Sequence, residues 1–262
     1  MIFYHDGQMR EGGLALDVGA EALRYGFGVF ETLYWNGAAP CRLREHLARA
    51  HASLEALGAG CERCDMAAVI PEVAARSGLL HRPGRVNLLF PVQDGVARPV
   101  VCAAPYEPLA PDRALRLALS PRPLHSWLGA HKTMNHLFYH LEHRAALERG
   151  FDGAALAAPD GHLLETATAA LVLADHGRLV TPAPPGAGDA APGILPSVAL
   201  ACVAGALGVE ARPVRLDELG RYAHAWALNS LMGMRPVARL GEVRFAPEFG
   251  PCAGADALIH AR

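Results

Sequence analysis

The sequence predicts a mixed α/β protein made of two parts. In the first part of the chain, β-branched and aromatic runs alternate with segments whose apolar residues recur at helical spacing. Prolines at positions 105, 108 and 111 then interrupt the chain. Beyond them, short strand-like runs separated by turn residues indicate a larger sheet or barrel with a few helices. We therefore predict a small N-terminal α/β domain over 1–107, a linker over 108–112 and a C-terminal domain over 113–262.

The N-terminal domain is expected to begin with a short hairpin that turns at Asp6-Gly7. A strand over 24–35 follows and ends at Asn36-Gly37. Gly26 and Gly28 inside this strand indicate that something passes close to its backbone. The other expected elements are helices over 43–57 and 66–77 and strands over 86–91 and 99–104.

The C-terminal domain is expected to open with a strand over 115–120. A helix over 135–149 stops at Gly150, and a loop over 182–193, rich in Pro, Gly and Ala, leads into a helix over 197–207. Further short strands are expected over 154–158, 162–165, 171–174 and 178–181.

Composition argues against several classes of protein. Apolar residues make up 52% of the 262 residues and charged residues 19%, which is typical of a globular chain. The formal net charge of −2 argues against nucleic acid or an anionic membrane as the main partner. No apolar run reaches the roughly 20 residues of a membrane span, and the first residues lack the pattern of a signal peptide. We therefore expect a cytoplasmic protein.

The six cysteines are scattered and do not form a disulfide framework. Cys61 and Cys64 form a CxxC pair, but no second pair accompanies them, and a Gly-Ala-Gly turn precedes them instead of a strand. Because the other ligands of a zinc site are missing, we expect neither a metal nor a redox centre at this pair.

Lys132 is the only lysine among the 24 Lys and Arg residues. Arg supplies charge and phosphate contacts, but it stays protonated near neutral pH and cannot act as an amine nucleophile. Lys can lose its proton when buried and then forms a Schiff base with a carbonyl compound or with pyridoxal phosphate. A single lysine also arises by chance in an Arg-rich chain, usually on the surface. The segments around it in the sequence must therefore distinguish a reactive lysine from a surface one.

Two further segments carry groups that a pyridoxal phosphate site needs. Residues 193–197 open a predicted helix, whose free amides and positive dipole end favour a phosphate. Glu165 ends a predicted strand, where a carboxylate can keep a pyridine nitrogen protonated. Each signal is weak alone, because most helix starts bind nothing and a glutamate at a strand end is more often a surface residue or a cap.

A series of segments in the same order resembles the class IV aminotransferase family, and the resemblance covers most of the chain. The series opens with Tyr25-Gly-Phe-Gly-Val-Phe-Glu-Thr-Leu33, Arg44-Glu-His-Leu-Ala-Arg49 and Lys132-x-x-Asn135. It continues with Gly150-Phe-Asp-Gly-Ala-Ala-Leu156, Asp160-Gly-His-Leu-Leu-Glu165, Gly177-Arg-Leu-Val-Thr-Pro182, Gly193-Ile-Leu195 and Asn229-Ser-Leu-Met-Gly-Met-Arg-Pro-Val237.

The resemblance implies a fold-type IV enzyme with a small N-terminal α/β domain and a larger C-terminal pseudo-barrel domain. It also implies bound pyridoxal 5'-phosphate, a small-molecule substrate and a homodimer. Lys132 would be the catalytic Schiff-base lysine, Glu165 the partner of the pyridine nitrogen, and Arg49 a charge-assisted donor to the phosphate. Without the resemblance, Arg49 reads as an ordinary solvent-facing helix residue. The other implied cofactor-binding residues are Thr168, Ile194, Leu195 and Ser230, and the candidate substrate residues are Thr32, Asn229 and Met232.

Within the family, two segments point to one branch. Asn135, three residues after the lysine, resembles the aminodeoxychorismate lyase and D-amino acid aminotransferase branches, and Asn229-Ser-Leu-Met resembles the lyase branch. Residues 91–96 lack the Arg and His of the D-amino acid enzymes. The implied reaction converts 4-amino-4-deoxychorismate into p-aminobenzoate and pyruvate, in folate biosynthesis. An aminotransferase of D- or branched-chain amino acids is the alternative.

Two departures from the family pattern keep a third possibility open. Ala170 stands where the family usually has Asn, which removes a side-chain contact near the cofactor. Leu195-Pro196 stand where it usually has Thr-Arg, which removes a hydroxyl from the phosphate cradle. A relative that has lost its activity, or that binds a metal, is therefore a further alternative.

Four histidines lie near the lysine, at positions 131, 136, 140 and 143. His136 and His140 are one helical turn apart, which is a spacing that can bind zinc. No Glu follows the first of them as in an HExxH motif, and no carboxylate ligand is evident. We interpret these histidines as structural and predict no metal site.

Overall fold

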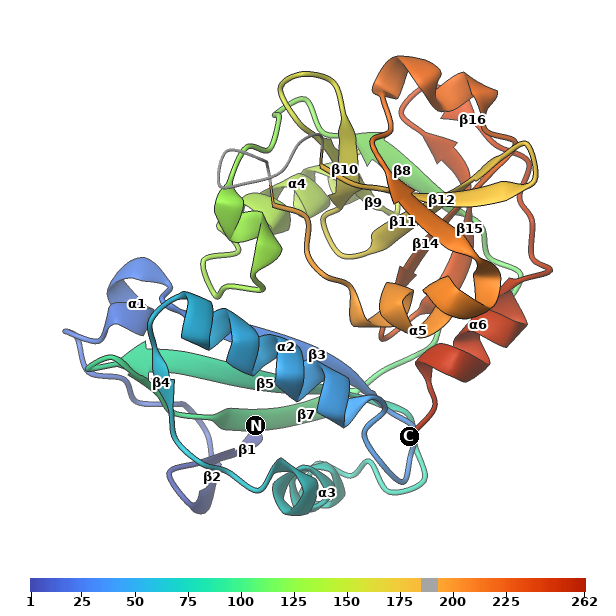
Figure 1. The fold of residues 1–262 in the computed structure, drawn as a ribbon. Coiled ribbons are helices and arrows are strands. Elements are labelled where there is room, and N and C mark those ends of the chain that lie inside the picture. Colours follow the sequence, from blue (N-terminus) through green and yellow to red (C-terminus); the bar gives the residue numbers. More distant parts are fainter. Residues whose placement is uncertain (185–192) are drawn as a thin grey trace. The chain divides into compact units, whose positions relative to one another are not determined.

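The computed structural model describes residues 1–184 and 193–262, and its chain divides into two compact units (Figure 1). The first unit comprises Met1–Pro108, His131–His136 and His260–Arg262, and the second comprises Leu109–Ala130 and Leu137–Ile259. Each unit has its own sheet, which confirms the predicted mixed α/β class. Most of the predicted loop over 182–193 lies outside the described residues. Among the residues that are described, no helix is long and apolar enough to cross a membrane.

The sheet of the first unit has seven strands in the order β2-β1-β7-β5-β6-β4, with β3 pairing with β5. Its strands are β1 Ile2–His5, β2 Gln8–Glu11, β3 Gly28–Trp35, β4 Gly60–Cys61, β5 Gly84–Gln93, β6 Val96–Ala97 and β7 Val100–Pro105, and its helices are α1 Glu21–Tyr25, α2 Leu43–Ala56 and α3 Met66–Arg76. The predicted hairpin at Asp6-Gly7, both predicted helices and both later strands are confirmed.

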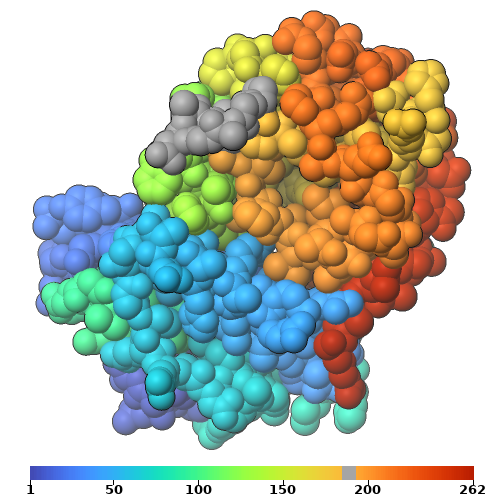
Figure 2. Space-filling view, viewed as in Figure 1, coloured from blue at the N-terminus to red at the C-terminus, as the bar shows by residue number. Residues whose placement is uncertain are grey.

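One apolar core fills the first unit. In β3, Val29, Leu33 and Trp35 are buried, and this strand pairs antiparallel with β5 along its whole length. Leu54 of α2 and Ile70 of α3 belong to the same buried cluster, so the apolar side of each helix packs on the sheet. The outer side of α2 is exposed and is visible in the space-filling view (Figure 2).

The strand predicted over 24–35 is wrong at its start. Arg24 and Tyr25 belong to α1, which ends where Gly26 adopts the left-handed conformation with φ of 66°. The pairing with β5 begins only at Gly28. The aromatic and β-branched character of this stretch predicted the strand, but the glycine that ends the helix decides where the strand begins.

The predicted close approach at Gly26 and Gly28 is confirmed. A Cβ added to Gly28 would lie 2.4 Å from the Phe90 carbonyl oxygen and 2.8 Å from Met134 Sδ. A Cβ added to Gly26 would lie 3.0 Å from the backbone nitrogen of Asn135. Both glycines therefore make room for the segment that follows Lys132.

The sheet of the second unit has nine strands in the order β10-β9-β8-β15-β14-β11-β12-β13, with β16 pairing with β15. Its strands are β8 Leu115–Leu119, β9 Gly153–Ala157, β10 Leu163–Thr166, β11 Ala170–Asp175, β12 Arg178–Pro182, β13 Val209–Arg212, β14 His224–Asn229, β15 Gly233–Leu240 and β16 Val243–Arg244. The α-helices are α4 Leu137–Glu148, α5 Val198–Leu207 and α6 Cys252–Ile259, and the 3-10 helices are η1 Trp127–Ala130 and η2 Leu216–Arg221.

This second sheet is curled, because β10, near one end of the strand order, also contacts β11 and β12 near the other end. Its two faces alternate along β14. Ala225 and Ala227 belong to one apolar cluster, whereas Trp226 and Leu228 belong to another that includes Val203 of α5. The curled sheet agrees with the pseudo-barrel predicted for this part of the chain.

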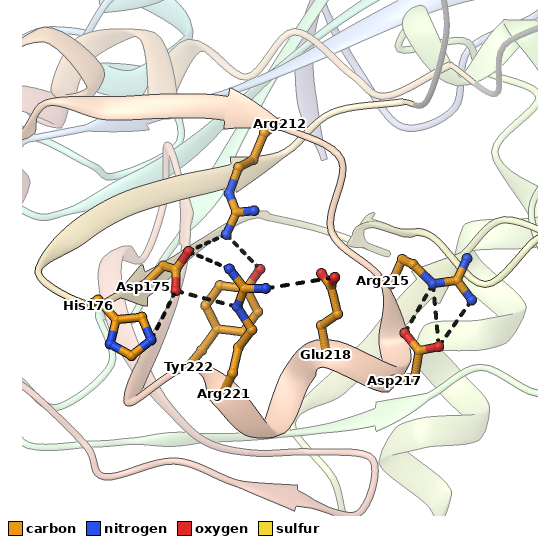
Figure 3. A network of polar contacts seen from close by, with 8 residues as sticks. All are labelled: Asp175, His176, Arg212, Arg215, Asp217, Glu218, Arg221 and Tyr222. Carbon is orange, nitrogen blue, oxygen red and sulfur yellow. Dashed lines mark hydrogen bonds and ion pairs between the residues drawn. The ribbon is translucent and has the colours of Figure 1, made fainter.

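A network of charged side chains fixes one end of the second sheet (Figure 3). Asp175, at the end of β11, accepts hydrogen bonds from Arg212 of β13 and from Arg221 of η2. Arg212 also donates to the hydroxyl of Tyr222, whose ring is buried. Hydrogen bonds from Arg221, together with both positive charges, hold the pKa of Asp175 below its ordinary value. The network joins β13 and η2 to the turn after β11.

Replacing Gly28 by alanine is expected to destabilise the protein. The new methyl would overlap the Phe90 carbonyl, and a φ of 148° is strained for any L side chain. We expect the free energy of unfolding in urea to fall by about 2 kcal/mol or more. Gly13→Ala is the matched control, because nothing lies within 4 Å of its added Cβ. Equal stability of the two variants would contradict the close approach at Gly28.

Candidate active site

Lys132 lies in an extended segment of the first unit that runs antiparallel to the start of β3. The backbone N–H of Phe30 donates to the Lys132 carbonyl at 2.8 Å, and the N–H of Met134 donates to the Gly28 carbonyl at 2.9 Å. Val29 and Thr133 form a β-bridge between these two bonds. The predicted helix over 135–149 consequently begins only at Leu137. Backbone pairing thus fixes where the lysine leaves the chain.

The amine of Lys132 lies over an aromatic ring. Its Nζ is 4.1 Å from the centroid of the Phe30 ring, which is within the range of a cation–π contact. His136 packs edge-on against the same ring, with centroids 5.1 Å apart. Nδ1 of His131 lies 3.1 Å from Ser53 Oγ, and burial lowers the pKa of His131. The half-buried amine is therefore held on an apolar support.

Arg49 is held by a buried carboxylate. Its Nε and Nη2 donate to the two oxygens of Glu31, at 2.8 and 2.6 Å, and His46 Nδ1 lies 2.6 Å from the second oxygen. The Glu31 and His46 side chains are each 1% exposed, and that of Arg49 is 12% exposed. Burial favours the protonated acid, but the bonds from His46 and Arg49 outweigh it and lower the pKa of Glu31. Arg49 is thus oriented by a two-pronged ion pair and is not an ordinary solvent-facing residue.

Glu165 lies in the second unit, near the end of β10, and only 6% of it is exposed. The hydroxyl of Tyr139, in the first turn of α4, faces this carboxylate, which is one cause of the raised pKa of Tyr139. Burial and the neighbouring Glu165 raise the pKa of Tyr139 well above its ordinary value. Sequence reasoning missed Tyr139, because its place seven residues after the lysine does not reveal a contact with β10.

The turn after Glu165 is joined to the β14–β15 turn by Asn229. Thr166 Oγ1 accepts hydrogen bonds from the amides of Thr168 and Ala169, at 3.1 and 2.7 Å. Asn229 Nδ2 donates to the Thr168 carbonyl at 3.1 Å, while its Oδ1 accepts from the amide of Met232 at 2.9 Å. The side chain of Asn229 therefore holds two turns together.

Thr168 and Met232, two of the predicted site residues, line one pocket of about 230 Å³ in the second unit. Leucines and alanines make up half of its lining residues. Arg113 and Asp152 also line it, and they form an ion pair. Such a pocket suits an apolar body with a polar group at one side.

Ile194 and Leu195 precede α5, which begins after Ser197. Ser197 caps this helix, because its Oγ accepts from the amide of Leu200 at 3.2 Å. Gly193 is hydrogen-bonded to the segment that precedes Lys132, because its N–H donates to the Ser126 carbonyl at 2.9 Å. A Cβ on Gly129 would lie only 2.2 Å from the Gly193 carbonyl oxygen. The segment leading to α5 and the segment leading to Lys132 thus touch through two glycines.

The remaining predicted residues are distributed over both units. Thr32, in β3, donates to Asn87 Oδ1 at 3.3 Å and belongs with Arg49 and Lys132 to the first unit. Ser230 is half-buried in the β14–β15 turn and belongs to the second unit. Ala170 is part of an apolar cluster. The structure groups the predicted residues in these two sets, and their roles stay predictions.

The histidines near the lysine are also divided. His131 and His136 belong to the first unit, whereas His140 and His143 belong to α4 in the second. Burial lowers the pKa of His143, and Nδ1 of this residue has no hydrogen-bond partner among the residues that the structure describes. Over residues 1–184 and 193–262, no group of three or more His, Cys, Asp or Glu side chains is arranged to hold a metal ion.

Two sheets, a lone lysine beside the first and a buried carboxylate on the second, define an α/β protein with the parts of a pyridoxal phosphate enzyme. The family model of class IV amino-transferases matches residues 28–240, and the chain belongs to this family. No curated protein matches the sequence.

Solved structures share the fold. A branched-chain aminotransferase of Thermoproteus uzoniensis, solved with norvaline, has a TM-score of 0.84 at 20% identity, covering 99% of this chain and 94% of that one. A hypothetical aminotransferase of Mycobacterium tuberculosis in its pyridoxal-phosphate-bound form has a TM-score of 0.81 at 22% identity, covering 98% of both chains. A Legionella pneumophila protein provisionally described as a 4-amino-4-deoxychorismate lyase has a TM-score of 0.79 at 21% identity, covering 93% of both chains. At these identities the likeness establishes the fold and not the reaction.

Class IV enzymes use pyridoxal phosphate, and the side chains described above fit this group. Lys132 supplies an amine, and Glu165 is a buried carboxylate suited to a protonated ring nitrogen. Arg49 is oriented by Glu31, and the start of α5 offers amides to a phosphate. Pro196 has no amide N–H, so this stretch has one donor fewer than a chain without proline there.

Replacing Glu31 by glutamine should leave Arg49 and His46 without their carboxylate. We expect the free energy of unfolding at pH 7 to fall by about 3–5 kcal/mol. Because the pKa of Glu31 is lowered on folding, its contribution is present above the ordinary Glu pKa of about 4.3 and is lost as the pH falls through the folded-state value. The difference between wild type and variant should therefore shrink in acid.

Urea unfolding at a series of pH values measures this difference. Glu72→Gln is the matched control, because Glu72 forms an exposed i,i+4 pair with Arg76 and should contribute less than about 0.5 kcal/mol. A Glu31→Gln effect that does not change between neutral and acidic pH would contradict the assigned ion pair.

Proposed function

We propose that this class IV enzyme is a pyridoxal-phosphate-dependent lyase that converts 4-amino-4-deoxychorismate into p-aminobenzoate and pyruvate. The observation that supports the lyase is the Asn229–Met232 turn. Asn229 holds it through Oδ1 contacts to the amides of Leu231 and Met232, so the segment presents Met232, and not a run of hydroxyl side chains, to an apolar pocket. Thr32, Asn229 and Met232 are the proposed substrate-contacting residues.

In this proposal the cofactor is held by the residues that the family resemblance singles out. Lys132 would hold it through a Schiff base, Glu165 would pair with its ring nitrogen, and Arg49 would bind its phosphate. The amides of Ile194 and Leu195 and the hydroxyl of Ser230 would complete the phosphate site, and Thr168 is a further proposed cofactor-binding residue. When bound, pyridoxal phosphate supplies an aldehyde for an amine and a ring that accepts an electron pair.

Lys132 also moves the proton. When the substrate amine has displaced it, the Lys132 amine would remove the proton from the substrate carbon that bears the nitrogen. Cleavage of the bond between the substrate ring and the enolpyruvyl oxygen would then leave an aromatic ring and release enolpyruvate, which becomes pyruvate on taking up a proton. Phe30, beneath the amine, keeps water away from one side of it. The negative charge of Glu165 would stabilise the protonated ring nitrogen of the cofactor.

A D- or branched-chain aminotransferase is the second candidate. The match to the family model of class IV amino-transferases supports it. In an aminotransferase the amino group stays on the cofactor after the first half-reaction, whereas a lyase releases it with the aromatic product. A relative without activity, or with a bound metal, would do neither.

The test is release of p-aminobenzoate from enzymatically generated 4-amino-4-deoxychorismate. We expect release by the loaded wild-type protein and none by Lys132→Ala, because Lys132 is the only lysine. Lys132→Arg is the matched control, since it keeps the charge and removes the nucleophile. A rate near that of wild type in Lys132→Ala would refute the assigned role, and a loaded wild-type protein that transfers amino groups but releases no product would favour the aminotransferase.

Borohydride reduction offers a second readout that does not need the substrate. Because the chain has one lysine, reduction in the presence of pyridoxal phosphate should label Lys132 and otherwise only the terminal amine. Peptide mapping by mass spectrometry distinguishes the two. Label at the terminus alone would show that Lys132 does not hold the cofactor.

We further propose a cytoplasmic homodimer. Two large apolar side chains of α1 are exposed, Leu23 by 56% and Tyr25 by 60%, and Val18 nearby is exposed by 82%. Large apolar side chains that stay exposed within one short stretch of chain favour a contact surface there. Light scattering should give twice the mass of one chain, and Leu23→Asp with Tyr25→Asp should shift it to the monomer.

The matched control for the dimer is Leu80→Asp, because Leu80 is an equally exposed leucine of the first unit, 58%, outside this group. It should leave the mass unchanged. A wild-type protein that stays monomeric at micromolar concentration would refute the homodimer.

A further inference from the structure

Tyr139 lies at a point where several elements of the second unit meet. It projects from the first turn of α4, and its ring packs against two apolar clusters. One cluster contains Ala167, and the other contains Leu164 and has Ile194 packed against it. Leu164 and Ala167 stand on either side of Glu165 in the chain, so the ring supports the stretch that carries this carboxylate.

The hydroxyl of Tyr139 makes a polar contact within these apolar surroundings. It faces the Glu165 carboxylate, as the effect of that carboxylate on the pKa of Tyr139 and the packing of its ring beside Leu164 and Ala167 indicate. It also lies 3.2 Å from the position that a Cβ would take on Gly129, in the turn just before Lys132. A buried carboxylate needs donors to remain charged, because its desolvation is otherwise costly.

We propose that Tyr139 is a positioning residue, which orients the Glu165 carboxylate and keeps it negatively charged for the ring nitrogen of the cofactor. This inference rests on the proposed use of pyridoxal phosphate by this chain. It does not depend on whether the reaction is elimination or amino transfer, because both need a protonated ring nitrogen.

The phenol is suited to this task because it stays a donor. Burial first, and the charge of Glu165 second, raise the pKa of Tyr139, so the hydroxyl keeps its proton over the range in which enzymes work. It cannot become a second negative charge beside Glu165. A hydrogen bond to the charged form of an acid favours that form.

The test is Tyr139→Phe, which removes the hydroxyl and keeps the ring that the two clusters pack against. The dissociation constant of pyridoxal phosphate is measured by titrating cofactor-free protein, and the pH dependence of the bound cofactor's absorbance is recorded. We expect affinity to fall about tenfold or more, since a hydrogen bond to a charged group contributes about 1.5–3 kcal/mol. The absorbance change should move to lower pH, because the ring nitrogen loses its proton more easily.

A double-mutant cycle with Glu165→Gln distinguishes a role of Tyr139 in orienting the Glu165 carboxylate from a role in packing alone. If Tyr139 acts through the charge of Glu165, the Tyr139→Phe change should have little effect in the Glu165→Gln background. Tyr222→Phe is the matched control, because Tyr222 is a buried tyrosine of the same unit whose hydroxyl bonds Arg212. It should change neither the affinity nor the absorbance profile, even if it lowers stability.

Two results would overturn the inference. One is a Tyr139→Phe protein with the affinity and the absorbance profile of wild type. The other is an equal loss of affinity in both Glu165 backgrounds, which would mean that the hydroxyl serves packing alone. Absence of lyase activity in a protein that binds the cofactor would refute only the proposed reaction, whereas a wild type that takes up no pyridoxal phosphate would refute both.

Discussion

The pairing of the Lys132 segment with β3 is the constraint on which the candidate site depends. The residues just before and just after this segment belong to the second unit, yet residues 131–136 belong to the first. Two backbone hydrogen bonds and one β-bridge hold it there, and only glycine at 26 and 28 leaves room for it. The point at which the Lys132 side chain leaves the main chain is therefore set by backbone pairing.

Two charged groups of the candidate site, Arg49 and Glu165, each lie against a partner side chain. Buried Glu31 accepts two hydrogen bonds from Arg49, and partly buried Tyr139 faces Glu165. Removing such groups from water is costly, so the ion pair in the first unit is weak evidence for stability by itself. What it provides is orientation: a charge fixed in advance needs no reorganisation when a ligand of opposite charge arrives.

Much of the fold was predictable from local pattern, and the misses share a cause. Helical periodicity gave α2 and α3, and turn residues gave the hairpins, because these elements depend on neighbours in the chain. The start of β3 at Gly28 and the extended form of residues 131–134 depend on pairing with a distant strand, which no local pattern records. Tyr139 was missed for the same reason. The resemblance singled out Lys132 and Glu165, but not the contacts that hold them.

Helix α2 provides two of the side-chain contacts described for the first unit. Arg49 and Ser53 stand four residues apart on one face, the first bound to Glu31 and the second in contact with the residue before the lysine. Successive residues of an α-helix are rotated by about 100°. One residue inserted between these two would swing Ser53 away from His131, while most surface loops accept an insertion. The spacing of these two residues is therefore fixed by their two contacts, so the stretch between them tolerates a change of side chain more readily than a change in the number of residues.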